Sequence, residues 1–166
     1  MADLINGVDV AKIKQTKEQA QEDPSATERE PKIVARWLGD SKARIELGDI
    51  FSEIGGDGNL NAMQTLLASL AACDIDLVAT HAALLGVNVE ELWIEASGRF
   101  NSRAYYGIEG ATGAGYNSIA YTVHLKAPKA TSKQIKFLKE RCERSSPVGD
   151  SLSKSIPLTL EVKVEQ

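Results

Sequence analysis

The longest apolar pattern in the chain runs from Asn59 to Leu85 and predicts a helix that is buried on most of its sides. One row of residues three or four apart contains Leu66, Leu70, Cys73, Leu77, His81 and Leu84, and a second row beside it contains Leu67, Ala71 and Val78. Asn59 or Asn61 can cap the first turn, and Gly86 offers a left-handed stop. Because a small open sheet covers only one side of such a helix, we expect a symmetric second copy to cover the other.

Stretches of alternating polarity on both sides of this helix predict strands. They are expected at residues 33–38, 43–47, 50–54, 87–100, 118–126 and 156–164. The first two should form a hairpin around Gly39 and Asp40, and the third ends in a glycine-rich loop at residues 55–58. The stretches 87–100 and 118–126 should pair with each other, because both alternate over a long range.

A second helix is predicted from a cap at Thr131 or Ser132 to about Arg144. The face it turns toward the protein should contain Gln134, Ile135, Leu138 and Cys142. Pro147 should end this helix, and residues 149–154 should form a connector to the last strand. The order of strands, long helix, strands, helix and strand predicts an α+β fold with largely antiparallel sheets.

The length and composition favour one globular domain. The chain has 166 residues, of which 43% are hydrophobic and 25% charged, so it is neither disordered nor membranous. Residues 1–31 look like an N-terminal arm or extra helix, and residues 32–166 like the core domain. Apolar runs stay below the roughly 18 residues of a spanning helix, and no secretion signal begins the chain, so a soluble cytoplasmic protein without a membrane partner is expected.

Charge and cysteine content narrow the function classes. The net charge is -4 and the basic residues are scattered, which argues against nucleic acid as a partner. The two cysteines, Cys73 and Cys142, lack neighbours at metal-ligand spacing, so neither a metal nor another cofactor is expected. The glycines of residues 107–115 do not have the dinucleotide-binding spacing, and a flexible link is the simpler interpretation.

The segment from Asn61 to Cys73, Asn-Ala-Met-Gln-Thr-Leu-Leu-Ala-Ser-Leu-Ala-Ala-Cys, resembles the reactive-cysteine segment of the OsmC family, which includes the organic hydroperoxide resistance proteins. The resemblance extends over residues 33–164. Residues 35–40 look like the first hairpin of the family, Gly86 like its helix exit, and residues 146–152 like its second-cysteine segment.

This resemblance implies an intertwined homodimer in which antiparallel sheets wrap around long buried central helices. It also implies that Cys73 attacks a peroxide oxygen and forms a sulfenic acid, with an Arg and a Glu completing the site. Arg44 is the best candidate for the Arg, with Arg36 and Lys42 behind it. A solvated charge on a strand is the alternative role for Arg44.

The match to the family is partial. Ser146 stands at the position of the second cysteine, and a serine cannot form a disulfide. Cys142, one helical turn earlier, could substitute as the resolving thiol or could be a structural cysteine on an apolar face. Met63 and Gln64 stand where family members have Glu.

Other polar and aromatic residues are expected to have structural roles. Asp74 and Asp76 would disfavour a thiolate at Cys73, and neither helps its activation. His81 is more readily a core histidine than a partner of Cys73, and His124 is expected on an exposed strand face. The aromatic residues expected in the sheet core or at an interface, or else around an apolar pocket, are Trp37, Trp93, Tyr105 and Tyr106.

Two functions therefore fit the sequence. The first is reduction of organic hydroperoxides by Cys73, assisted by Arg44, with an external thiol reductant in place of the missing resolving cysteine. The second is a non-catalytic dimer that binds a small apolar ligand in an interfacial pocket, which the loss of the acid and of the second cysteine favours.

Overall fold

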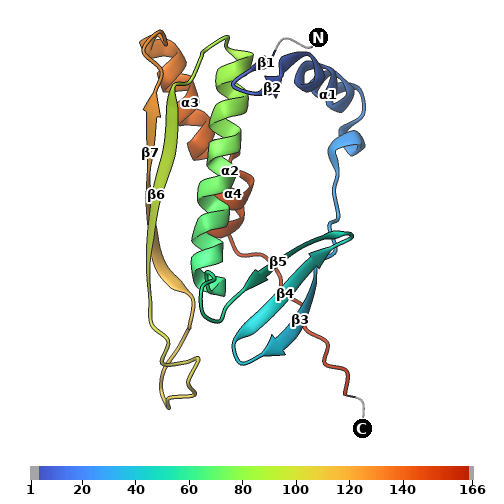
Figure 1. Cartoon of the computed structure of the whole chain (residues 1–166), viewed down its shortest axis with the longest axis vertical. Helices are drawn as coiled ribbons and strands as arrows, with labels where there is room; N and C mark the ends of the chain where they lie inside the picture. Colours follow the sequence, from blue (N-terminus) through green and yellow to red (C-terminus); the bar gives the residue numbers. More distant parts are fainter. Residues whose placement is uncertain (1–3, 165–166) are drawn as a thin grey trace.

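The computed structural model describes residues 4–164, which form an α+β fold along one long helix, α2 (Figure 1). The elements in chain order are β1 (Leu4–Ile5), β2 (Val8–Asp9), α1 (Val10–Glu22), the 3-10 turn η1 (Pro24–Thr27), β3 (Val34–Gly39), β4 (Lys42–Leu47), β5 (Ile50–Ile54), α2 (Ala62–Leu84), β6 (Glu91–Phe100), β7 (Tyr116–Lys126), α3 (Ser132–Ser145) and α4 (Pro147–Ser153). The sheets are antiparallel, as predicted.

Helix α2 begins and ends at the predicted signals. The Asn61 side chain accepts a hydrogen bond from the Gln64 amide at 2.9 Å, and the Gln64 side chain accepts one from the Asn61 amide at 2.9 Å. Beyond the last turn, Gly86 has a φ of 68°, the left-handed conformation that glycine adopts without strain. Helix α2 is long and apolar enough to cross a membrane. This is only weak evidence for a membrane-spanning helix, because the core helices of soluble proteins have the same length and composition.

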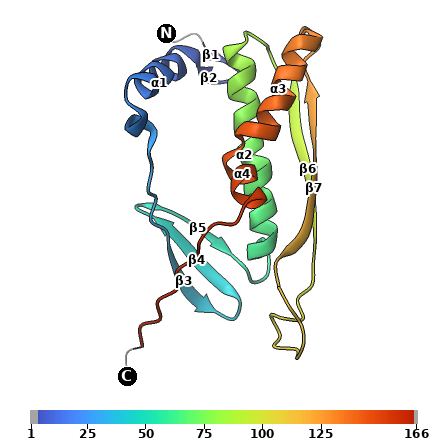
Figure 2. The same cartoon turned by 180° about the vertical axis from the view of Figure 1, so that it is seen from behind.

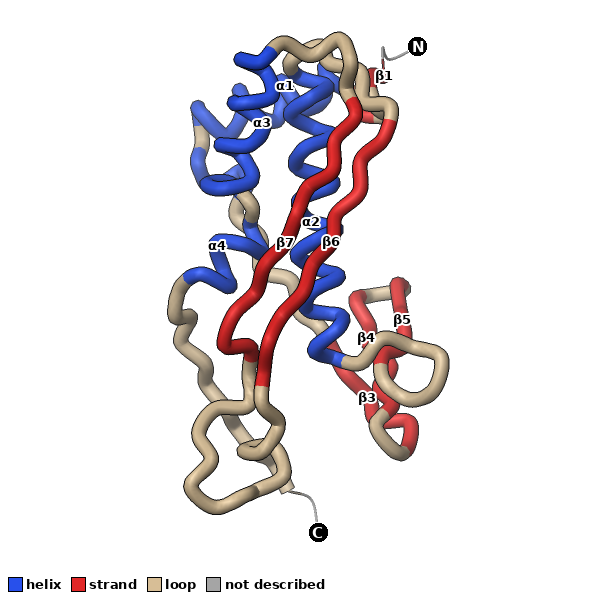
Figure 3. The backbone as a smooth tube through the Cα atoms, turned by 90° about the vertical axis from the view of Figure 1, so that its left-hand side faces the viewer, coloured by secondary structure: helices blue, strands red, loops and turns tan. Residues whose placement is uncertain are grey.

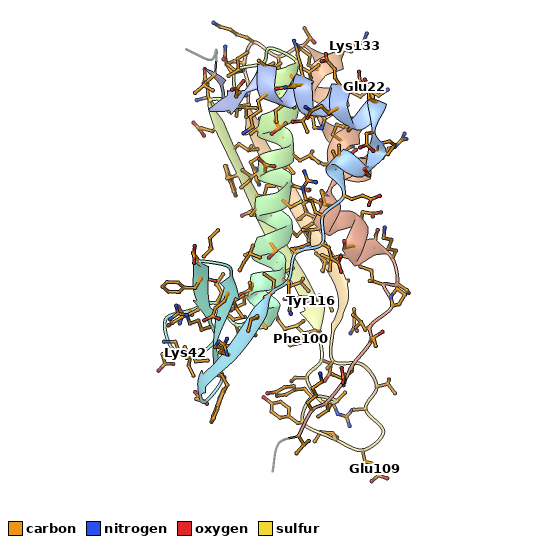
Figure 4. The ribbon with its side chains drawn as sticks, turned by 90° about the vertical axis from the view of Figure 1, so that its right-hand side faces the viewer. Glu22, Lys42, Phe100, Glu109, Tyr116 and Lys133 are labelled. Carbon is orange, nitrogen blue, oxygen red and sulfur yellow. The ribbon has the colours of Figure 1, made fainter. Side chains whose placement is uncertain are left out.

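The long hairpin β6–β7 runs along one side of α2 (Figure 3). At the end of the hairpin, the Tyr116 hydroxyl donates to the Met63 carbonyl at 2.8 Å, which ties the start of β7 to the start of α2 (Figure 4). The Tyr116 ring crosses over Gly98, where an added Cβ would stand 2.5 Å from the ring. A glycine is therefore required at position 98 for this close approach.

The small sheet has the order β3-β4-β5 and projects from the N-terminal end of α2 (Figure 1). Its register separates the two faces by chemistry. Trp37 opposes Ala43, which in turn opposes Ile54, on an apolar face, whereas Arg36 opposes Arg44 on a charged face. Trp37 is 78% exposed, so in a single chain the apolar face is uncovered.

The N-terminal arm is attached to the C-terminal end of α2. Asn6, in the turn between β1 and β2 with a φ of 54°, donates to the Val87 carbonyl at 3.0 Å and accepts from the Val89 amide at 2.9 Å. Helix α1 follows, capped by Asp9, and has no buried residue. The arm and the β3–β5 sheet extend to the same side of α2, joined by a segment that runs apart from it (Figures 1 and 2).

Helix α3 packs against the C-terminal half of α2, where Ala82, Val87 and Leu138 form the buried core. The predicted inward position of Ile135 is wrong, since its side chain is 40% exposed and Phe137 packs against the core instead. The predicted inward position of Gln134 is confirmed, since its side chain donates a hydrogen bond to the Leu85 carbonyl at 3.2 Å.

The interpretation of residues 149–154 as a connector is wrong, because most of this segment belongs to the helix α4. Ser146 caps α4 and Pro147 occupies its first turn, where the missing amide proton of proline costs nothing. Pro147 therefore ends α3 and begins α4.

The predicted strand at residues 156–164 has no regular secondary structure in the described chain. Its apolar row is open to solvent, with Leu158 95% and Leu160 86% exposed. A strand exists only with a hydrogen-bonded neighbour, and the described residues of a single chain do not supply one here. The prediction of a strand at residues 156–164 is therefore wrong for the described residues of one chain.

Candidate functional site

Cys73 lies in the middle of α2 and is half-buried, with a free thiol. The hydroxyl of Ser146 donates to its sulfur, at an Oγ–Sγ distance of 3.8 Å. Residues far apart in the sequence are thus brought together at the position where the sequence resemblance placed a second cysteine. Where the resemblance implies two thiols, this chain therefore has a thiol and a hydroxyl.

The start of α4 holds Ser146 in place. Its side chain is 2% exposed, and its oxygen accepts a hydrogen bond from the Gly149 amide at 3.0 Å. An added Cβ at Gly149 would stand 2.9 Å from this oxygen, so a larger residue would push the serine away from its position. The hydroxyl therefore caps the helix through its oxygen and donates its proton toward Cys73.

Asp74, Tyr121 and Cys142 lie together behind this contact. Asp74 is fully buried, and neither carboxylate oxygen has a hydrogen-bond partner. Burial, and next the negative charge of Asp74, raise the pKa of Tyr121 to about 12. The Tyr121 hydroxyl lies beside the Asp74 carboxylate, and its interaction with that carboxylate contributes to the raised pKa.

Cys142 has the surroundings of an unreactive thiol. Burial and then the charge of Asp74 raise the pKa of Cys142 to about 11, so it stays protonated at neutral pH. A resolving cysteine acts as a thiolate, and the group in contact with Cys73 is Ser146. These observations favour the structural role that the sequence left open for Cys142.

Arg44 lies in an ion-pair cluster on the charged face of the β3–β5 sheet. Its Nε is 3.2 Å from Glu46 Oε1, and its guanidinium stacks over the Phe51 ring at 3.9 Å. Glu46 is shared with Arg36, whose Nε lies 3.0 Å from Oε2, while Lys42 pairs separately with a carboxylate of β5 at 2.6 Å. These partners all belong to the sheet, so the described part of one chain does not bring Arg44 to Cys73.

Met63 and Gln64, at the position where family members have Glu, make structural contacts in this chain. Gln64 completes the capping box of α2, and the Met63 carbonyl accepts the hydrogen bond of Tyr116. Neither supplies a carboxylate, and among the described residues no cluster of metal-ligating side chains is found.

The histidines and tryptophans have structural surroundings. His81 meets Phe137 edge to face at 5.9 Å, and burial, followed by Arg141 and Lys17, lowers its pKa. His124 stacks on Trp93 at 3.6 Å across the hairpin. The remaining aromatics of interest are exposed, namely Trp37, Tyr105 and Tyr106.

A cavity of about 620 Å³ lies beside the site, between α2, β7, α3 and α4. Its apolar wall contains Met63, Leu66, Leu70, Tyr116, Ile119 and Leu152. Tyr121, Cys142 and Ser146 line it as well, so the cavity reaches both the cysteine–serine contact and the buried Asp74 cluster. The association of Tyr121 with Asp74 could not be predicted from the sequence, because nothing local signals a contact between residues so far apart in the chain.

The fold and the site define an α+β thiol protein whose half-buried cysteine faces a hydroxyl. A family model described as OsmC-like protein matches residues 55–161. Since this range spans more than half of the chain, the protein belongs to the OsmC-like family. No curated protein sequence matches it closely enough to count as a relative.

Solved structures show the same fold. An OsmC-like protein from Mycoplasma pneumoniae has 16% identity and a TM-score of 0.63, with 76% of this chain and 89% of that chain covered. A hypothetical protein from Aquifex aeolicus VF5 has 13% identity and a TM-score of 0.61, at 76% and 89% coverage. An organic hydroperoxide resistance protein OsmC from Legionella pneumophila has 14% identity and a TM-score of 0.51, at 75% and 91% coverage. At these identities the likeness concerns the fold alone.

Proposed function

We propose that this protein reduces organic hydroperoxides through Cys73 alone and that an external thiol regenerates it. Membership of the OsmC-like family supports a role in the stress response, and the names of similar structures include organic hydroperoxide resistance. The observation that carries the proposal is the hydrogen bond from Ser146 to the Cys73 sulfur at 3.8 Å. Ser146 provides a hydrogen-bond donor to the Cys73 sulfur, but it has no thiol with which Cys73 could form a disulfide.

The proposed reaction has two stages. The Cys73 thiolate attacks the terminal oxygen of the hydroperoxide, the O–O bond breaks, and the alkoxide leaves as an alcohol after it takes up a proton. The sulfur is oxidised to a sulfenic acid. A small external thiol then displaces water to form a mixed disulfide, and a second thiol releases reduced Cys73 together with the oxidised reductant. A cytoplasmic location would supply such thiols.

We further propose that the active form is a homodimer. The uncovered apolar face of the β3–β5 sheet, the exposed alternating segment 156–164 and the exposed Ile75 on α2 support this assembly. Because the Arg44 cluster lies on a sheet that projects from its own chain, a second copy is the source from which an Arg could approach Cys73. Size-exclusion chromatography with light scattering should give twice the chain mass, and a monomer at all concentrations would contradict this part of the proposal.

The peroxidase proposal is tested by treating the reduced protein with one equivalent of cumene hydroperoxide in the presence of dimedone. Peptide mass spectrometry should find the dimedone adduct on Cys73 in the native protein and in Cys142→Ser, and no adduct in Cys73→Ser. Consumption of cumene hydroperoxide should then require added thiol. An unmodified Cys73 after this treatment would end the proposal.

A second candidate function is a non-catalytic dimer with an apolar ligand in an interfacial pocket. It is favoured by the acidic position, because Gln64 is engaged in the helix cap and no carboxylate replaces the expected Glu there. Native mass spectrometry of freshly purified dimer should show a retained ligand if this function applies. Thiol-dependent turnover of hydroperoxide without any retained ligand would rule it out.

A further inference from the structure

The cavity between α2, β7, α3 and α4 lies within a single chain and is large enough for a small molecule. Its volume of about 620 Å³ is within the range of roughly 300 to 1,000 Å³ that small-molecule sites have. Leu66 and Leu70 of α2 and Ile119 of β7 belong to its apolar wall. The apolar body of a ligand therefore has its partners on α2 and β7.

Two hydroxyl groups of the lining are already engaged within the chain. The Ser146 hydroxyl accepts from the Gly149 amide at 3.0 Å and donates to the Cys73 sulfur at 3.8 Å. The Tyr116 hydroxyl donates to the Met63 carbonyl at 2.8 Å. These two groups therefore do not decide which ligand the cavity prefers.

The charged residues of the lining leave one cation without a partner. The charged side chains that line the cavity are Glu143, Asp150 and Arg144. The Glu143 carboxylate is paired with Lys139, at an Nζ–Oε1 distance of 3.8 Å, and Asp150 is paired with Lys154. In the described part of the chain, the side chain of Arg144 forms neither a salt bridge nor a hydrogen bond. The lining therefore presents an uncompensated positive charge to a ligand.

Arg144 lies in the last turn of α3. A positive charge at this position stabilises the helix by opposing the partial negative charge of its end. That effect acts through the charge and leaves the N–H groups of the guanidinium free. These donors form a planar fork that matches the two oxygens of a carboxylate.

We propose that this cavity binds a small amphipathic carboxylate. The carboxylate group accepts hydrogen bonds from Arg144, and the apolar body lies against Leu66, Leu70 and Ile119. The site lies within one chain and requires neither a second copy nor oxidation of Cys73. It therefore goes beyond the proposed hydroperoxide reduction and differs from a pocket at a dimer interface.

The test uses three probes with one skeleton: 4-phenylbutyrate, 4-phenylbutanol and 4-phenylbutylamine. Isothermal titration calorimetry on the reduced full-length protein, without hydroperoxide, makes the result independent of the proposed reaction. The carboxylate should bind about fivefold more tightly than the alcohol, the upper end of what a solvent-exposed ion pair contributes. The amine should bind most weakly. In Arg144→Gln the preference for the carboxylate over the alcohol should fall to about twofold or less.

Lys136→Gln is the matched control, because Lys136 is an exposed cation on the same helix that does not line the cavity. It removes the same charge from the protein and should keep the native preference. Leu152→Trp places a large side chain in the cavity lining and should weaken binding of the carboxylate and the alcohol alike, with circular dichroism to show that it is folded.

Equal affinity for carboxylate and alcohol in the native protein would overturn the assignment, as would an absence of binding by every probe. An unchanged preference in Arg144→Gln, or an equal loss of preference in Lys136→Gln, would show that Arg144 does not hold the carboxylate. Unchanged binding by folded Leu152→Trp would place the probes outside this cavity and would contradict the proposal as well.

Discussion

Replacing Ser146 by cysteine should restore a disulfide with Cys73. The Ser146 oxygen is 3.8 Å from the Cys73 sulfur, whereas bonded sulfurs are about 2.05 Å apart, so the side chains must approach by less than about 2 Å. Rotation of the two side chains can provide this movement without a shift of the helices. Oxidised Ser146→Cys should lose 2 Da relative to its reduced form, the mass of about two hydrogens.

The stabilisation can be estimated from the length of chain that the bond closes. The two positions are 73 residues apart, for which the chain-entropy model gives about 4 kcal/mol. Loss of the serine cap of α4 costs about 1 kcal/mol, which leaves about 3 kcal/mol. For a chain of this size, that corresponds to a rise in Tm of roughly 6 to 12 °C.

Differential scanning calorimetry with and without dithiothreitol measures this rise, and thiol titration measures the bond. The native chain has two free cysteines, so the reduced variant should titrate as three thiols and the oxidised one as a single thiol. Cys142→Ser combined with Ser146→Cys should keep the disulfide, and Cys73→Ser combined with Ser146→Cys should lose it. A disulfide that requires Cys142 instead, or three titratable thiols after oxidation, would refute the geometry of the site.

Three further outcomes follow from described contacts. Because burial raises the pKa of Cys142 from 9.0 to about 11, iodoacetamide at neutral pH should label Cys73 and spare Cys142, which peptide mapping can check. For the same reason the folded state should lose stability as the pH rises from 9 to 11, and urea unfolding should show a smaller loss in Cys142→Ala. Asn6→Gly keeps the left-handed turn but removes the side-chain hydrogen bonds at the end of α2, so urea unfolding should show a loss of about 2 kcal/mol. Gly98→Ala should displace the Tyr116 ring, 2.5 Å from the new methyl group, and cost about 2 kcal/mol by the same measurement, whereas Tyr116→Phe should cost only about 1 kcal/mol.

The sequence predicted the elements whose signals are local. The sequence offered Asn59 or Asn61 as the cap of α2 and Gly86 as its stop, and the structure uses Asn61 and Gly86. Helix α4 was missed because Pro147 was taken only as a stop. Ser146 followed by a proline is also an N-cap signal, which could have identified the helix.

Only the part of the site that the family resemblance covers was predicted from the sequence. The pairing of Ser146 with Cys73 follows from the order of the family segments, but the group of Asp74, Tyr121 and Cys142 depends on how α2, β7 and α3 pack together. The sequence shows Asp74 as one acid in an apolar helix. Its complete burial without a partner is a property of the tertiary structure.

The exposed segment 156–164 has a consequence for the newly made chain. Its alternating apolar residues would make it prone to stacking with other copies into fibrils before it finds its correct neighbour. Pro157 interrupts one end, and the side chains of Glu161 and Lys163, 3.7 Å apart, place charge along the polar row. Such gatekeeper residues oppose in-register stacking, so neutralising both charges is expected to shorten the lag time of thioflavin T fluorescence on heating.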